Sequence, residues 1–121
     1  MEKHFVDYNQ ALALKELGFN ESCLASWNFY TNEFNYNPYP STFSSDDVIQ
    51  LPLKSQVFEW FRKYRLSVVI EDYLDDYEVK IVEWMLFDDR ITHEFPNRFD
   101  SWGDAESAAI DKLIELVKNG R

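Results

Sequence analysis

Three β-rich runs follow one another within 30 residues of this chain, separated by very short polar breaks. The runs cover residues 66–73, 77–87 and 91–95. A pair of aspartates stands in each break: Asp75 with Asp76, and Asp88 with Asp89. Breaks of this length are typical of β-hairpin connections. The sequence therefore predicts an antiparallel meander over this part of the chain.

An amphipathic helix is predicted on each side of this meander. Residues 53–65 carry apolar side chains at the i, i+3, i+4 and i+7 spacing of one helix face, namely Val57, Trp60, Phe61 and Tyr64. The other helix begins after Ser101, whose capping-box partner is Asp104, and ends at Asn119 and Gly120. We expect both helices to bury one face in the core.

The first 30 residues predict one further helix and one strand. Asp7 with Gln10 forms a capping box, and Gly18 provides the left-handed residue that ends a helix over residues 8–17. Apolar and polar side chains then alternate from Cys23 to Phe29, which indicates a half-buried strand. Cys23 lies on the apolar side, so we interpret it as a small buried hydrophobic residue rather than a nucleophile.

Residues 31–50 show neither a helical nor a strand period, and we interpret them as a long loop. A loop of this length in a compact domain is often functional. It carries four aromatic residues that are candidates for contact with a partner: Phe34, Tyr36, Tyr39 and Phe43. The alternative is that these rings pack back on the domain and cover the sheet.

These elements predict an α+β fold, with an antiparallel sheet of about four strands and three helices in the order α-β-α-β-β-β-α. The length of 121 residues predicts a single domain over residues 1–121. No stretch of 18 apolar residues and no signal peptide is visible, so we expect a soluble, cytoplasmic protein.

The charge is strongly negative, with 22 acidic against 12 basic residues and a net charge of −10. This balance opposes binding to nucleic acid phosphates or to anionic lipid. The segment from Glu71 to Glu94 holds nine acidic and two basic residues, and so has a net charge of −7. The candidate partner-binding acids of this segment are Asp72, Asp75, Asp76, Glu78, Asp88 and Asp89. They suggest a surface for a basic partner, in imitation of nucleic acid, or else a solvated sheet edge protected by charge.

No catalytic signature is present. The two histidines, His4 and His93, are far apart in the sequence, and no known nucleophile, P-loop or dinucleotide motif occurs. The single cysteine excludes an internal disulfide and a cysteine zinc cluster, and the acids lack the spacing and glycine of a calcium loop. We therefore predict no catalytic residues, no metal and no cofactor.

Three stretches resemble a family of small uncharacterised proteins from bacterial phages and mobile elements of the Bacteroidetes type. They are ALALKELGFNESC, PLKSQVFEWFRKYR and DAESAAIDKLIELVK, and together they cover about a third of the chain. The resemblance implies a compact α+β domain encoded by an accessory gene. It supplies no catalytic residues.

The leading hypothesis is a non-enzymatic acidic binding protein, an accessory protein of a phage or mobile element. It would engage a basic, nucleic-acid-binding protein through its acidic hairpins and aromatic loop. One alternative is a small enzyme or enzyme subunit with an acidic pocket. Another is a structural or assembly component that acts as a homo-oligomer.

Overall fold

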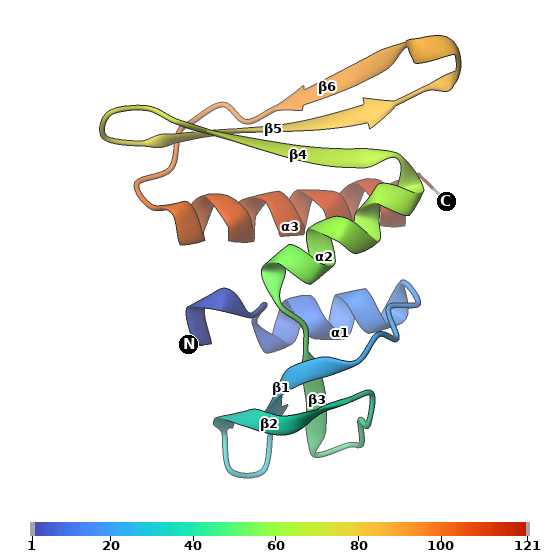
Figure 1. Cartoon of the computed structure of the whole chain (residues 1–121), viewed down its shortest axis with the longest axis vertical. Coiled ribbons are helices and arrows are strands. Elements are labelled where there is room, and N and C mark those ends of the chain that lie inside the picture. Colours follow the sequence, from blue (N-terminus) through green and yellow to red (C-terminus); the bar gives the residue numbers. More distant parts are fainter. Residues whose placement is uncertain (1, 121) are drawn as a thin grey trace. The chain divides into compact units, whose positions relative to one another are not determined.

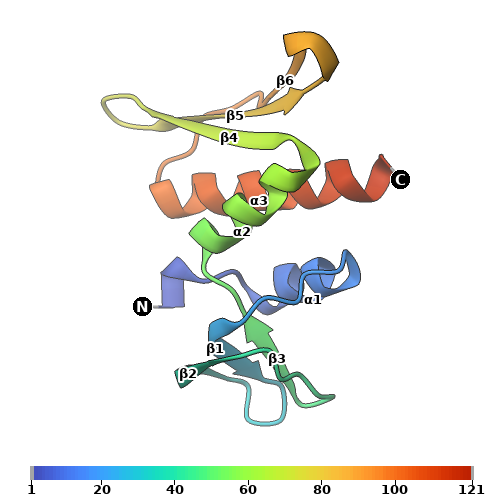
Figure 2. The same ribbon diagram turned by 45° about the vertical axis from the view of Figure 1, so that its right-hand side comes forward.

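Residues 2–120 form two three-stranded antiparallel sheets and three α-helices, joined by turns and short 3₁₀ segments, in a computed structural model (Figures 1 and 2). The structure describes residues 2–120, apart from the side chains of Pro38 and Asp88. The α+β class is confirmed, but one sheet of about four strands was wrong: the strands divide between two compact units, residues 1–56 and 57–121. A single domain over residues 1–121 stays a prediction.

Helix α1 (Tyr8–Glu16) of the first unit begins at the predicted residue and ends one residue earlier than predicted, with Leu17 as its C-cap. The Asp7 carboxylate accepts a hydrogen bond from the Gln10 N–H at 2.7 Å, and the Gln10 side-chain oxygen accepts one from the Asp7 N–H at 3.2 Å. At the other end, Gly18 has a φ of 99°, and the Phe19 N–H donates to the Leu14 carbonyl. These bonds satisfy backbone groups that a helix end leaves free.

The first sheet places β1 (Cys23–Asn28) between β2 (Glu33–Ser41) and β3 (Val48–Leu51). The strand from Cys23 is thus confirmed, but the interpretation of residues 31–50 as a loop was wrong. Strand β2 lies at the sheet edge and includes Pro38 and Pro40, which an edge or bulge tolerates although they hide the strand pattern in the sequence. The predicted element order accordingly lacks two strands.

The predicted meander is confirmed in the second unit, where β4 (Leu66–Asp72), β5 (Tyr77–Trp84) and β6 (Arg90–Glu94) form a sheet in that order. Helix α3 (Trp102–Asn119), capped by Ser101 as predicted, runs along one face of this sheet (Figure 1). Helix α2 (Lys54–Phe61) continues as a 3₁₀ turn (Arg62–Tyr64) and leads into β4.

Small residues of α3 let the helix approach the sheet closely. Ala105 and Ala109 are fully buried against Val79 of β5. Aromatic and aliphatic side chains pack around this contact: Phe58, Val68, Ile70, Tyr77, Phe95 and Phe99. No helix within residues 2–120 is long and apolar enough to cross a lipid bilayer.

Replacing Phe61 with alanine should lower the free energy of unfolding of the second unit by about 3–5 kcal/mol, the usual effect of truncating a buried aromatic side chain. The Phe61 ring is fully buried, and its centroid lies 5.0 Å from that of Trp60. Urea unfolding followed by tryptophan fluorescence measures the change. As the control, Leu74→Ala removes a side chain that is 98% exposed and should leave stability unchanged. Equal midpoints for the two variants would contradict the packing described for α2.

Candidate functional site

Strand β2 carries an unusually large bulge. Ala25 of β1 pairs with Tyr36, but Cys23 pairs with Ser41, so residues 37–40 of β2 stand opposite Leu24 alone. A bulge of this kind removes backbone hydrogen bonds from the ladder and turns side chains away from the sheet. We call residues 37–43, which include this segment, the aromatic bulge.

The side chain of Asn37 fixes the bulge to both neighbouring strands. Its amide nitrogen donates to the Cys23 carbonyl at 3.1 Å and to the Gln50 side-chain oxygen at 2.7 Å. Its amide oxygen accepts a hydrogen bond from the Ser26 hydroxyl at 3.3 Å. Gln50 in turn donates to the carbonyl of Phe43, so side-chain amides hold the aromatic bulge at both ends.

The four aromatic residues predicted to contact a partner differ in their exposure. Phe34 is half-buried, with its ring centroid 5.5 Å from that of Phe5, and the Tyr36 ring meets Phe5 edge-on at 6.4 Å. Tyr39 and Phe43, in contrast, are 81% and 65% exposed. Phe34 therefore packs on the unit, as the packing alternative expects, while Tyr36, which is 53% exposed, contacts Phe5 and still faces solvent together with Tyr39 and Phe43.

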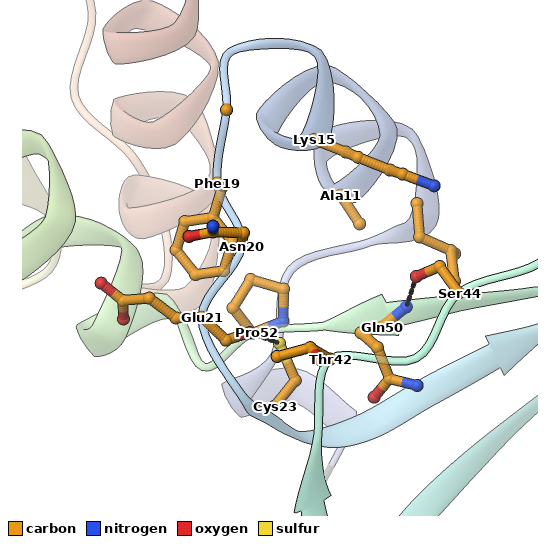
Figure 3. A pocket seen from close by; sticks show the side chains of 12 residues that line it. Ala11, Lys15, Phe19, Asn20, Glu21, Cys23, Thr42, Ser44, Gln50 and Pro52 are labelled. Atoms are coloured by element: carbon orange, nitrogen blue, oxygen red, sulfur yellow. Dashed lines mark hydrogen bonds between the residues drawn. The ribbon is translucent and has the colours of Figure 1, made fainter.

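A pocket of about 490 Å³ lies beside the aromatic bulge, between the end of α1 and strand β3 (Figure 3). Lys15, Glu21 and Cys23 are among its lining residues. The Glu21 carboxylate accepts a hydrogen bond from the Gln56 amide at 3.2 Å and points away from Gln50 (Figure 3). Burial, and to a lesser extent the charge of Glu21, raises the pKa of Cys23 to about 12. The thiol thus stays protonated at neutral pH and is not an activated nucleophile.

The predicted acidic residues lie at both ends of the second sheet. Asp72, Asp75, Asp76 and Glu78 gather around the β4–β5 turn, next to the start of α3, because Tyr77 contacts Trp102. Asp89 lies at the opposite end, beyond Trp84, and the Asp88 side chain is outside the described residues. The eight residues of β5 separate the two turns by roughly 23 Å, at about 3.3 Å per residue. They do not form one continuous surface.

One arginine offsets part of the charge at the β4–β5 turn. Arg98 lies 3.4 Å from the Asp76 carboxylate and 3.9 Å from that of Glu78, and its guanidinium stacks 3.9 Å from the Tyr73 ring centroid. The exposed carboxylates of Asp72 and Asp75 have no ion-pair partner among the described side chains. We call residues 71–78 the acidic turn.

The carboxylates of the acidic turn raise the pKa of neighbouring groups. The charges of Glu78 and then Glu71 raise the pKa of the exposed Tyr73 hydroxyl, an effect that Arg98 opposes. The hydrogen bond to Glu78, followed by the charges of Glu78 and Glu71, likewise raises the pKa of Lys80. Carboxylates therefore remain in excess around Arg98, which supports the expected role of this turn in attracting positive charge.

A histidine–carboxylate pair was missed by the sequence reasoning. His93 of β6 lies with its Nε2 3.0 Å from a Glu83 carboxylate oxygen on β5. The pair joins two strands diagonally, because Ile81 is opposite His93 and Ile91 is opposite Glu83. Only the register of the hairpin brings the two side chains together, and no local sequence motif predicts their contact. Among residues 2–120, no group of three His, Cys, Asp or Glu side chains is placed to hold a metal ion.

Comparison with known proteins found no relative of this chain. No protein-family model, curated protein or solved structure matches the chain. Within the first unit, the geometry offers exposed aromatic side chains on a hydrogen-bonded segment, beside an open pocket. Within the second, it offers a negative turn at one end of a sheet.

Replacing Asn37 with alanine should lower the free energy of unfolding of the first unit by about 1–3 kcal/mol, because buried hydrogen-bonding groups lose their partner. Hydrogen exchange should also become faster in residues 37–44. Asn35→Ala is the matched control, since Asn35 is an exposed residue of the same strand. Unchanged exchange in the Asn37 variant would show that the aromatic bulge does not depend on this side chain.

Proposed function

We propose that this protein is a non-enzymatic binding protein that engages a basic protein partner. The observation that carries the proposal is the aromatic bulge, in which Tyr39 and Phe43 are exposed although their backbone is held by side-chain amides. Aromatic side chains are enriched at protein-interaction surfaces relative to the rest of a protein surface. The aromatic bulge is therefore assigned as the contact surface.

The fixed backbone matters as much as the exposed rings. A flexible loop loses conformational entropy when it binds, whereas a loop that is already ordered loses little. Asn37 and Gln50 order the aromatic bulge in the free protein. Tyrosine also offers a large contact area with few rotatable bonds. These features favour a protein partner that receives the rings of Tyr39 and Phe43 in apolar pockets.

The charge of the chain selects the class of partner. A net charge of −10 attracts basic proteins and repels acidic ones, and it speeds the encounter with a basic surface. Proteins that bind nucleic acid carry such surfaces, because they must neutralise phosphates. The acidic turn, with Asp72 and Asp75 free of ion pairs among the described residues, supplies part of this attraction. Asp89, at the other end of the sheet, belongs to a separate region.

The cellular setting is part of the same proposal. The resemblance of three stretches to proteins of phages and mobile elements suggests an accessory protein that acts on a host or phage factor. A single cysteine, Cys23, suits the reducing cytoplasm.

A small-molecule-binding role is the second candidate, and the pocket beside the aromatic bulge favours it. Its volume of about 490 Å³ falls within the range of roughly 300–1,000 Å³ that is typical of ligand sites. The lining differs from the acidic pocket expected for an enzyme. Glu21 is its one carboxylate, already bonded to Gln56, and the Cys23 thiol is protonated. Ligand binding is therefore favoured over catalysis at this pocket.

Replacing both Tyr39 and Phe43 with serine should abolish capture of a basic partner from a lysate of the native host, with little change in melting temperature. The reason is that these rings contribute contact area to a partner but little to the core. Tyr30→Ser provides the matched control, because Tyr30 is 86% exposed in the same unit but lies outside the aromatic bulge. If the double variant captures the same proteins as the control, the aromatic bulge is not the contact surface.

Reversing Asp72 and Asp75 to lysine should slow association with the captured partner at low ionic strength, since charge steering acts over a Debye length of about 8 Å at physiological salt. The change alters the net charge by +4. A control with Glu2→Lys and Glu16→Lys makes the same change in the first unit, on exposed residues. Association rates measured across a salt series separate the two. Equal slowing in both variants would show that total charge matters and the acidic turn does not.

A further inference from the structure

Strand β6 forms a free edge of the second sheet, with β5 on its other side. The Met85 N–H donates to the Asp89 carbonyl at 2.7 Å, and this pair continues the register in which Trp84 is opposite Arg90. Hydrogen-bonded pairs alternate along an antiparallel ladder. The backbone groups of Ile91 and His93 therefore face β5, and those of residues 90, 92 and 94 face outward.

The opposite side of β5 supports this alternation independently. The Trp84 N–H donates to the Arg65 carbonyl at 2.9 Å, in register with the β4–β5 ladder. Even-numbered residues of β5 therefore bond to β4, which leaves the odd-numbered ones to bond to β6. Both observations give Thr92 an outward-facing N–H and carbonyl.

The outward edge is complementary to itself. Strand β6 reads Arg90, Ile91, Thr92, His93, Glu94, with opposite charges at equal distances from its centre. When two such strands pair antiparallel about Thr92, Arg90 of each copy stands opposite Glu94 of the other. In this register, Thr92 pairs with Thr92 of the second copy, and residue 90 pairs with residue 94. These are hydrogen-bonded pairs, because residues 90, 92 and 94 are the ones whose backbone groups face outward.

We infer that the protein forms a symmetric dimer in which β6 pairs with β6 of a second copy, centred on Thr92. The pairing joins two three-stranded sheets into one of six strands, with about six backbone hydrogen bonds across the junction. Opposite charges placed directly across an antiparallel pair stabilise it, and here there are two such pairs.

The side chains on both faces of β6 fit this arrangement. On one face, the Arg90 guanidinium lies 5.8 Å from the Trp84 ring centroid, on the same face of the sheet as Glu94 of the second copy would lie. On the other face, Ile91 is 47% exposed and would be covered by His93 of the second copy. Glu83 already orients the His93 ring. Helix α3 packs mainly on β4 and β5, so β6 stays accessible.

Another sheet edge, β2, is unsuited to such pairing. It has prolines at positions 38 and 40, within a bulge, and proline lacks the N–H that a new strand needs. Charged residues often protect edges by repelling a second strand. In β6 the opposite signs of Arg90 and Glu94 remove that protection for one partner, namely an antiparallel copy of the same strand.

Sedimentation equilibrium of the full chain over a wide concentration range tests the inference. The wild type should show a reversible monomer–dimer equilibrium. Thr92→Pro removes an N–H that faces away from β5, so the chain should keep its melting temperature while the dimer dissociation constant rises about tenfold or more. Thr92→Val, which keeps the N–H, is the control and should dimerise like the wild type. Dimers that persist in a folded Thr92→Pro variant overturn the inference.

A charge exchange provides the second test. Arg90→Glu and Glu94→Arg should each weaken the dimer, because like charges then stand opposite each other. The double variant carrying both changes restores opposite charges and should recover most of the wild-type affinity. A double variant as weak as the single ones, or a wild type that stays monomeric up to millimolar concentration, overturns the inference. Either result leaves the aromatic bulge in the first unit as a separate question.

Discussion

The side-chain amide of Asn37 replaces backbone hydrogen bonds that the bulge in β2 removes. Because several residues of β2 face Leu24 alone, their peptide groups cannot all pair with β1. Asn37 bonds to a β1 carbonyl and to Gln50 of β3, and Gln50 bonds to the carbonyl of Phe43. This short network lets exposed aromatic rings sit on an ordered backbone. It also shapes the pocket, which Gln50 helps to line.

In the second unit, the β4–β5 turn holds both carboxylates that are paired with Arg98 and carboxylates that have no ion-pair partner among the described side chains. Arg98 offsets part of the charge of Asp76 and Glu78 and stacks on Tyr73, so it links the β4–β5 turn to the segment that follows β6. Asp72 and Asp75 lie outside that arrangement and face solvent. A surface pair of this kind contributes little to stability by itself. The contacts of Arg98 instead order the turn that carries the carboxylates of Asp72 and Asp75, and so determine where these negative charges lie.

Local signals predicted much of the fold. The capping box at Asp7, the glycine at position 18 and the serine at position 101 each satisfy backbone groups within a few residues, so the sequence alone reveals them. Strands β2 and β3 depend instead on pairing with β1. The prolines and asparagines in this part of the sequence interrupt the alternating pattern by which a strand is predicted. The Glu83–His93 contact depends on the register of a hairpin, which no single residue encodes.

The candidate site was predictable in part for the same reason. Composition identified the four rings of Phe34, Tyr36, Tyr39 and Phe43, but the partial burial of Phe34 depends on Phe5, a residue distant in the sequence. The wide separation of the two aspartate pairs was available from the sequence, because it follows from the length of β5. The net charge of a segment does not show this separation, because it takes no account of where along a strand each charge lies.

Antiparallel pairing of β6 also explains how two copies of this negatively charged protein could associate without strong repulsion between their acidic turns. The acidic turn lies at the end of the hairpin where β5 begins, which is the end of β6 that carries Glu94. In the inferred dimer, Glu94 of one copy lies beside Arg90 of the other, so the two acidic turns occupy opposite ends of the six-stranded sheet. Each turn is then separated from the other by several times the Debye length of about 8 Å. Parallel pairing would place the two turns side by side, and their repulsion would oppose it. The distribution of charge along the hairpin thus favours the same antiparallel register as the backbone groups of β6.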